Sequence, residues 1–283
     1  MPALGPPLPS PSPLPVSLTP RKTADLGLLE HGRELVDPAV IGTTSILKAI
    51  ARSAPSVRRV VITSSFASIL DETKVEDPGT VFTEASWNPV TAADVEGGSA
   101  ATAYRASKKL AEAAAWDITR DPAVGARFDL ATVCPPLVLG PVVHHLASID
   151  AVNTSNERIA HLVAGRWRES GVAPTGVALN WIDVRDCAEA HVRALERPEA
   201  GGRRLFTTAG AFCNRDIYDV VRRNFPEYAD RLPPPDKEGG EMPPDDRRYR
   251  YDNSETQRIL GIEWIPFEKS IVDAVKSFQE LGI

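Results

Sequence analysis

Two β-branched runs separated by one long Ala-rich segment limit the possible folds of this chain more than any other feature. The runs span residues 59–65 and 130–134, and the segment rich in Ala, Lys, Leu and Glu spans residues 100–116. Continuous apolar strands are typical of parallel sheets covered on both faces, and the Ala-rich composition favours helix. The order strand, helix, strand therefore predicts an α/β fold.

A tyrosine and a lysine share one face of the predicted helix. Tyr104 and Lys108 are four residues apart, which places their Cβ atoms about 6 Å from each other. The nearby ammonium favours the phenolate and so makes the phenol a better proton donor at neutral pH. Ser65, at the end of the first strand, can hydrogen-bond a substrate oxygen and hold it against the phenol. Together the three side chains predict reduction of a carbonyl group, with the hydride supplied by a cofactor.

The order of these residues resembles the extended short-chain dehydrogenase/reductase family. The resemblance is to its branch of dihydroflavonol reductases, cinnamoyl-CoA reductases and fungal aldehyde or ketone reductases, and it runs from about residue 29 to the C-terminus. It rests on Thr-Ser-Ser at 63–65, Tyr-x-x-x-Lys at 104–108 and the Pro-containing segment 135–141. The Tyr-x-x-x-Lys spacing alone is a weak signal, and the flanking strands make it specific.

The resemblance implies the roles of individual residues. Ser65 would bind the substrate oxygen, Tyr104 would donate the proton, and Lys108 would hold the cofactor ribose and tune the phenol. Ser64 is the alternative position for the catalytic hydroxyl. The cofactor-binding residues that the resemblance implies are Ser64, Tyr104, Lys108, Pro135 and Val138. The implied cofactor is NADP, with NAD as an alternative, and the implied substrate is a small-molecule aldehyde or ketone.

The Gly-rich turn that holds the pyrophosphate of a dinucleotide is not found in this sequence. Neither Gly-x-Gly-x-x-Gly nor Gly-x-x-Gly-x-x-Gly occurs in its 283 residues, and the family-like part begins at the helix before the first strand. We therefore expect a Rossmann-like, doubly wound parallel sheet that is N-terminally truncated and carries a small C-terminal substrate-binding lobe. We also expect such a chain to bind NADPH weakly or not at all.

Three regions follow from this interpretation. Residues 1–28 form a Pro-rich leader, with eight prolines in residues 1–20, which is expected to be disordered. Residues 29–141 form a partial Rossmann domain that contains the Ser, Tyr and Lys. Residues 142–283 combine the remaining Rossmann strands, at about 176–208, with the substrate-binding lobe.

Charge and composition exclude several classes of partner. A net charge of −6 and a pI near 5.5 favour neither nucleic acid nor an anionic membrane as partner. No apolar run approaches the roughly 20 residues of a membrane helix. Three cysteines without a Cys-x-x-Cys pair predict a reduced, cytoplasmic protein. The oligomeric state stays open.

Several polar residues are expected to be structural. His144, His145 and His161 lack a Cys or carboxylate at ligand spacing, so no metal site is expected, and they should line or flank the substrate cleft. Asp186 is predicted to cap a helix rather than to form a catalytic pair with Asp183. Three further expectations are a packing role for loop residue Trp87, a first-turn position for Pro38, and a helix capped by Asn214.

Two other functions remain open. The chain could be a non-catalytic truncated homologue that binds substrate or pairs with an intact reductase. It could also be an epimerase or dehydratase of the same fold, but Ala39 stands where the similar segment of sugar epimerases has Asn, which favours a reductase. A role in secondary metabolism is a further expectation.

Overall fold

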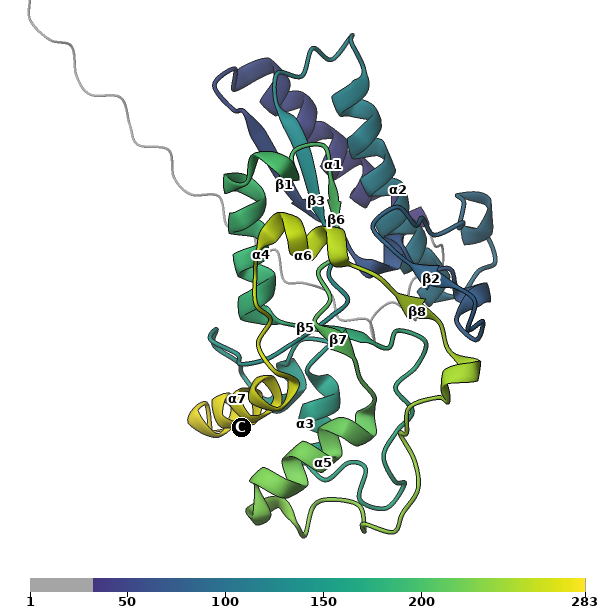
Figure 1. Cartoon of the computed structure of the whole chain (residues 1–283), viewed down its shortest axis with the longest axis vertical. Helices are drawn as coiled ribbons and strands as arrows, with labels where there is room; N and C mark the ends of the chain where they lie inside the picture. Colours follow the sequence, from purple (N-terminus) through teal and green to yellow (C-terminus); the bar gives the residue numbers. More distant parts are fainter. Residues whose placement is uncertain (1–32, 283) are drawn as a thin grey trace, which may run out of the picture.

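The computed structural model describes residues 33–282, and the predicted Pro-rich leader lies outside these described residues. The helices are α1 (Arg33–Ser53), α2 (Ala100–Arg120), α3 (Glu157–Val163), α4 (Val184–Glu196), α5 (Asn214–Asn224), α6 (Ser254–Leu260) and α7 (Phe267–Glu280). The strands are β1 (Arg59–Thr63), β2 (Val81–Phe82), β3 (Asp129–Val133), β4 (Leu137–Leu139), β5 (Asn180–Asp183), β6 (Arg204–Leu205), β7 (Gly210–Ala211) and β8 (Arg250–Tyr251). Helices are interspersed with strands that pair mostly in parallel, which confirms the predicted α/β fold (Figure 1).

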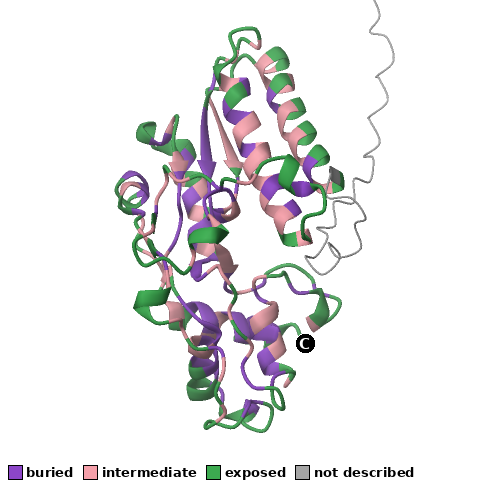
Figure 2. Ribbon diagram, turned by 90° about the vertical axis from the view of Figure 1, so that its right-hand side faces the viewer, coloured by how far each residue is buried: buried purple, intermediate pink, exposed green. Residues whose placement is uncertain are grey.

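The first sheet has the strand order β1-β3-β6 and is parallel throughout. Successive side chains of a strand point to opposite faces. Val60 and Ile62 accordingly pack with α1 and α2, whereas Val61 packs with Ala190 and Ala194 of α4. Helices therefore cover both faces of the sheet, which explains the unbroken apolar run in β1. In Figure 2, exposed residues alternate with buried and intermediate ones along the helices beside this sheet.

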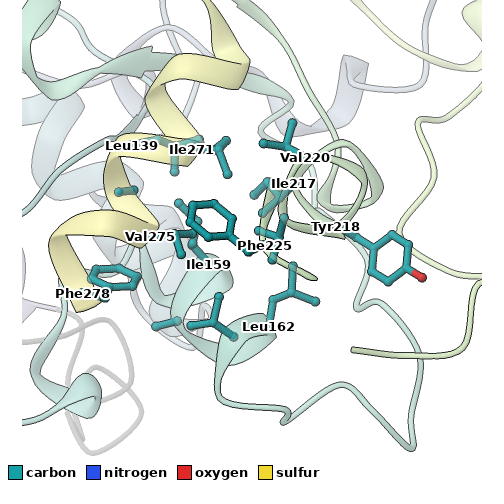
Figure 3. Packing of buried hydrophobic residues seen from close by; sticks show 14 of the residues in the cluster. Leu139, Ile159, Leu162, Ile217, Tyr218, Val220, Phe225, Ile271, Val275 and Phe278 are labelled. Carbon is teal, nitrogen blue, oxygen red and sulfur yellow. The ribbon is translucent and has the colours of Figure 1, made fainter. Parts of the chain in front are cut away.

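The rest of the molecule is mainly a C-terminal lobe with its own sheet and its own hydrophobic core. Strand β4 pairs in parallel with β5, and β5 pairs antiparallel with β7. Helices α3, α5 and α7 meet beside this sheet around buried side chains such as Ile159, Ile217 and Phe278 (Figure 3). Only Cys134, Pro135 and Pro136 separate β3 of the first sheet from β4 of the second.

Three expected helix starts differ from the structure. Helix α1 begins at Arg33, so Pro38 lies inside it and not in its first turn. Helix α4 begins at Val184 with Asp183 as its N-cap, because the Asp183 carboxylate accepts a hydrogen bond from the Arg185 N–H. The expected cap at Asp186 was wrong.

The start of α5 was wrong by one residue. Asn214 is the first residue of this helix, and Cys213 is the N-cap. The Cys213 N–H donates to the Asp216 carboxylate at 2.7 Å, which satisfies a backbone donor that the helix leaves free. Within residues 33–282, no helix has the length and apolar character needed to cross a bilayer.

Candidate active site

A cavity of about 840 Å³ lies beside the carboxyl end of β1 and the first turns of α2. Ser65, Tyr104 and Lys108 all line it. Strand β1 ends at Thr63, so the chain leaves the sheet at the point where Ser65 reaches the cavity. The structure thus brings together the three side chains for which the sequence predicts catalytic roles.

Helix α2 sets the positions of Tyr104 and Lys108. It begins at Ala100, and Ser99 is its N-cap, because the Ser99 Oγ accepts a hydrogen bond from the Thr102 N–H. The Lys108 ammonium nitrogen lies 5.7 Å from the centre of the Tyr104 ring. Within residues 33–282, neither the Tyr104 hydroxyl nor the Lys108 ammonium has a hydrogen-bond or ion-pair partner. Both polar groups are therefore available to a ligand in the cavity.

Ser65 is held in place by a short 3-10 turn, Phe66–Ser68. Its Oγ accepts a hydrogen bond from the Ala67 N–H at 3.1 Å, and its carbonyl accepts one from the Ser68 hydroxyl at 2.7 Å. The Phe66 N–H donates to the Pro135 carbonyl at 2.8 Å, which ties the turn to the segment after β3. Because the Ser65 hydroxyl only accepts within this turn, its O–H remains free to donate to a substrate oxygen.

The other predicted cofactor contacts lie at the edge of the site or behind it. Ser64 is buried, and its hydroxyl donates to Glu112 at 2.5 Å, away from the cavity. Pro135 is buried as well, and the Val138 N–H donates to Ser155 Oγ at 3.1 Å. The intervening residues Pro136 and Leu137 line the cavity.

Glu112 is a residue of this region that the sequence interpretation missed. It is only 2% exposed, yet it is charged and accepts hydrogen bonds from several side chains. These donors are Ser64, Ser68, Trp116, Thr132 and Arg204. Burial by itself raises the pKa of the Glu112 carboxyl, but the hydrogen bond and charge of Arg204, with the two serine hydroxyls, leave that pKa below its ordinary value. Glu112 is thus a buried carboxylate that is fully paired.

The partner of Glu112 extends the network to a loop beside the sheet. The Arg204 Nε lies 2.7 Å from Glu112 Oε1, and its Nη1 donates to the Glu84 carbonyl at 2.8 Å. The guanidinium also stacks 3.8 Å from the centre of the Trp87 ring. Trp87 therefore packs against Arg204, in agreement with the packing role expected for it.

A sequence signal for Glu112 was present. Tyr104, Lys108 and Glu112 are spaced at i, i+4 and i+8, so all three lie on one face of α2. Glu112 receives hydrogen bonds from Ser64 and Ser68, which flank Ser65 on both sides. The face of α2 that carries the predicted proton donor also anchors the turn that carries the predicted catalytic hydroxyl.

The remaining candidates do not reach the cavity. His144 and His145 are exposed, and the His161 ring packs edge-on against Trp167; none of the three lines the cavity. Asp183 caps α4, and the Asp186 carboxylate accepts a hydrogen bond from the Ile265 N–H at 2.7 Å, so both aspartates are structural. Among the described residues, no group of three or more His, Cys, Asp or Glu side chains could hold a metal ion.

Curated proteins of similar sequence include several that are named as reductases. A ketoreductase of Aspergillus niger is 42% identical over 250 residues, which cover 87% of this chain and 70% of that protein. The NADPH-dependent methylglyoxal reductase of Saccharomyces cerevisiae is 33% identical over 247 residues, covering 87% and 71%. Cinnamoyl-CoA reductase 1 of Petunia hybrida is 32% identical over 251 residues, covering 88% and 67%. No protein-family model matches the chain.

Solved structures agree with these sequence relatives. The crystal structure of Gre2 from Candida albicans matches with a TM-score of 0.78 at 28% identity, over 90% of this chain and 75% of that one. Yeast methylglyoxal/isovaleraldehyde reductase Gre2, solved with NADPH, matches with a TM-score of 0.75 at 30% identity, over 90% and 74%. Both the Rossmann-like fold and the resemblance stated from the motifs are confirmed. The chain belongs to the extended short-chain dehydrogenase/reductase family, in the branch of the ketoreductases, methylglyoxal reductases and cinnamoyl-CoA reductases.

Proposed function

We propose that this chain is an NADPH-dependent reductase that converts an aldehyde or ketone to an alcohol. The observation that carries the proposal is the position of Ser65, Tyr104 and Lys108 around one cavity. Within residues 33–282, the Tyr104 hydroxyl and the Lys108 ammonium have no hydrogen-bond partner, and the Ser65 hydroxyl only accepts one. Relatives named as a ketoreductase and as NADPH-dependent methylglyoxal reductases support it. We assign the catalytic part to residues 29–141, and the remaining strands with the substrate lobe to 142–283. The buried free cysteines Cys134, Cys187 and Cys213 support a cytoplasmic setting.

The three side chains divide the chemistry between them. The substrate carbonyl oxygen accepts hydrogen bonds from the Ser65 and Tyr104 hydroxyls, which orient it and stabilise the negative charge that develops on it. NADPH, when bound, supplies the hydride to the carbonyl carbon. Tyr104 then gives its proton to the oxygen, and the Lys108 ammonium stabilises the phenolate that this transfer leaves behind.

The residues present fit one end of the cofactor. The free ammonium of Lys108 suits the hydroxyls of the nicotinamide ribose, and Pro136 and Leu137 offer an apolar wall for the ring. The sequence contains no Gly-rich turn for the pyrophosphate, and each charged hydrogen bond lost there weakens binding by about 1.5–3 kcal/mol. We therefore infer that these residues hold the nicotinamide end and that this chain alone binds NADPH weakly.

The proposal is tested by a reduction assay that compensates for weak binding. Purified protein is incubated with millimolar NADPH, deuterated at the transferred position, and with a panel of aldehydes and ketones. The expected result is loss of NADPH absorbance together with deuterium on the carbinol carbon of the product. Carbonyl compounds that bind without any deuterium transfer would instead favour the non-catalytic homologue. Interconversion of epimers without net consumption of NADPH would favour the epimerase.

Substituting the two adjacent serines one at a time separates catalysis from stability. Ser65→Ala is expected to lower kcat by about a hundredfold, because it removes a hydrogen-bond donor to the developing oxyanion. Ser64→Ala is expected to lower kcat only slightly and to reduce the free energy of unfolding by about 1 kcal/mol, since its hydroxyl donates to Glu112. Steady-state rates and urea titrations measure both quantities. The reverse order of the two kcat values would assign the catalytic hydroxyl to Ser64.

A further inference from the structure

The cavity of about 840 Å³ adjoins a smaller pocket of about 330 Å³. Of the described residues, only Arg105 lines both spaces. Sequence neighbours also divide between them at two places. Leu70 lines the cavity and Asp71 lines the smaller pocket, and on α2 Ala101 lines the cavity and Thr102 lines the smaller pocket. The two spaces therefore lie side by side, with Arg105 at the boundary.

An ion pair lies at this boundary. The Arg105 Nη1 is 2.6 Å from a carboxylate oxygen of Glu72, which lines the smaller pocket. Glu72 begins a 3-10 turn, Glu72–Lys74, and Arg105 lies in the second turn of α2. The Arg105 side chain is only 14% exposed, so most of its surface is covered by protein. The pair thus joins α2 to the segment that follows Leu70 and separates the two spaces.

The other walls of the smaller pocket are held by hydrogen bonds that do not involve Arg105. Asn88 lines the pocket and is buried, and its side-chain amide donates to the Ala67 carbonyl at 2.9 Å. The Lys109 ammonium donates at 3.0 Å to the carbonyl of Val90, another lining residue. The pocket should therefore keep its shape when the Arg105 side chain is shortened.

The two spaces differ in the side chains around them. Phe66 and Leu70 give the cavity apolar walls, which suit an apolar part of a substrate. The smaller pocket has three acidic lining residues, Asp71, Glu72 and Asp94. A molecule that extended from the cavity into the smaller pocket would therefore need a polar end that can donate a hydrogen bond.

We propose that Arg105 is a specificity-determining residue, and that the substrates are carbonyl compounds whose apolar part is short enough to end at its side chain. The inference rests on the proposed function, which assigns the carbonyl group to Ser65 and Tyr104. A longer chain must displace the guanidinium from Glu72 or press against it, and overfilling a packed space is unfavourable. Without the guanidinium, the cavity and the smaller pocket form one continuous space.

The test measures, by binding alone, how long a substrate chain can be. Wild type and Arg105→Ala are titrated by calorimetry, without cofactor, with unbranched methyl ketones of increasing length that carry a hydroxyl group at the far end. For short ketones the two proteins are expected to have equal affinity. Ketones long enough to pass the boundary are expected to bind about 10- to 100-fold more tightly to Arg105→Ala, because the wild type must overfill its cavity to hold them.

Two further variants separate the boundary from the loss of charge. Arg120→Ala is the matched control, because it removes an arginine from the same helix and changes the net charge equally. Arg120 stacks on the Trp116 ring and, within residues 33–282, lines neither space, so its affinities should follow the wild type at every chain length. Arg105→Lys keeps a cation beside Glu72 and should favour the long ketones less than Arg105→Ala does.

The Arg105→Ala variant is expected to fold. Glu72 is 49% exposed, so its carboxylate stays solvated when its partner is removed, and an ion pair of this kind contributes little to stability. Thermal melting should therefore place Arg105→Ala within a few degrees of the wild type.

Three results would overturn the inference: equal affinities of wild type and Arg105→Ala at every chain length, no binding of any ketone to either protein, or the same gain for long ketones in Arg120→Ala. Because no cofactor is present, these outcomes do not depend on turnover. If Arg105→Ala admits the longer ketones but no deuterium is transferred in the reduction assay, the proposed function fails and the boundary at Arg105 stands. Deuterium transfer without any change in chain length would leave the function and remove the inference.

Discussion

Replacing Tyr104 with phenylalanine is expected to lower the rate of carbonyl reduction by about a hundredfold to ten-thousandfold, the usual contribution of a positioned general acid. The substitution removes one hydroxyl and keeps the aromatic ring, so the contact with Lys108 remains. Within the described chain that hydroxyl makes no hydrogen bond, and its loss therefore leaves no buried group unpaired. Rates at saturating carbonyl substrate and millimolar NADPH measure the effect, and circular dichroism checks the fold.

The control for this experiment is Tyr228→Phe. Tyr228 is buried in the C-terminal lobe, where it packs with Phe225 and Arg231, and it does not line the cavity. The Tyr228→Phe variant should therefore reduce the carbonyl substrate at the wild-type rate. A Tyr104→Phe variant that keeps more than about a tenth of the activity would show that another group donates the proton.

Replacing Glu112 with leucine is expected to lower the free energy of unfolding by about 3–5 kcal/mol, the cost of leaving one partner of a buried ion pair alone. Arg204 would then remain as an unpaired cation with a side chain only 9% exposed, and the Ser64 hydroxyl would lose its carboxylate acceptor. Urea titration measures the change. The double variant Glu112→Leu, Arg204→Leu should lose less than the sum of the two single variants, because it leaves no uncompensated charge.

The stability conferred by Glu112 should also depend on pH in one direction. The pKa of Glu112 in the folded protein lies below its ordinary value of 4.5. Its contribution is therefore fully present above that value and is lost as the pH falls through the lowered pKa. On acidification, the wild type should lose its advantage in stability over Glu112→Leu. The control is Glu255→Leu, which removes a carboxylate that pairs with Arg258 at the surface, and its effect on stability should change little with pH. A Glu112→Leu variant as stable as the wild type at neutral pH would contradict this account.

Local patterns were sufficient to predict the elements around the cavity. The strands of the first sheet follow from continuous apolar runs, and α2 follows from its composition, because both signals lie within a few neighbouring residues. The spacing of Tyr104 and Lys108 on one face likewise needs only the geometry of a helix. The starts of α4 and α5 were placed wrongly because capping depends on which side chain turns back to a free N–H, and Asp183 and Asp186 are equivalent in sequence terms.

The groups that support the cavity could not be predicted in the same way. Arg204 meets Glu112 across 92 positions of the chain, and no local pattern pairs them. A buried charge in a sequence looks the same as a solvated one, and only the tertiary contacts show which cations have a counter-ion and which do not.

The short link between the two sheets has a consequence for the geometry of the cavity. Two of the three residues between β3 and β4 are prolines, whose rings hold φ near about −65°. The Phe66 N–H is bonded to the first of them, and the second lines the cavity. A hinge needs residues that can absorb large changes of backbone angle, and this link cannot supply them. The link is therefore stiff, and we expect it to keep the turn that carries Ser65 and the Pro136 wall of the cavity at a constant separation.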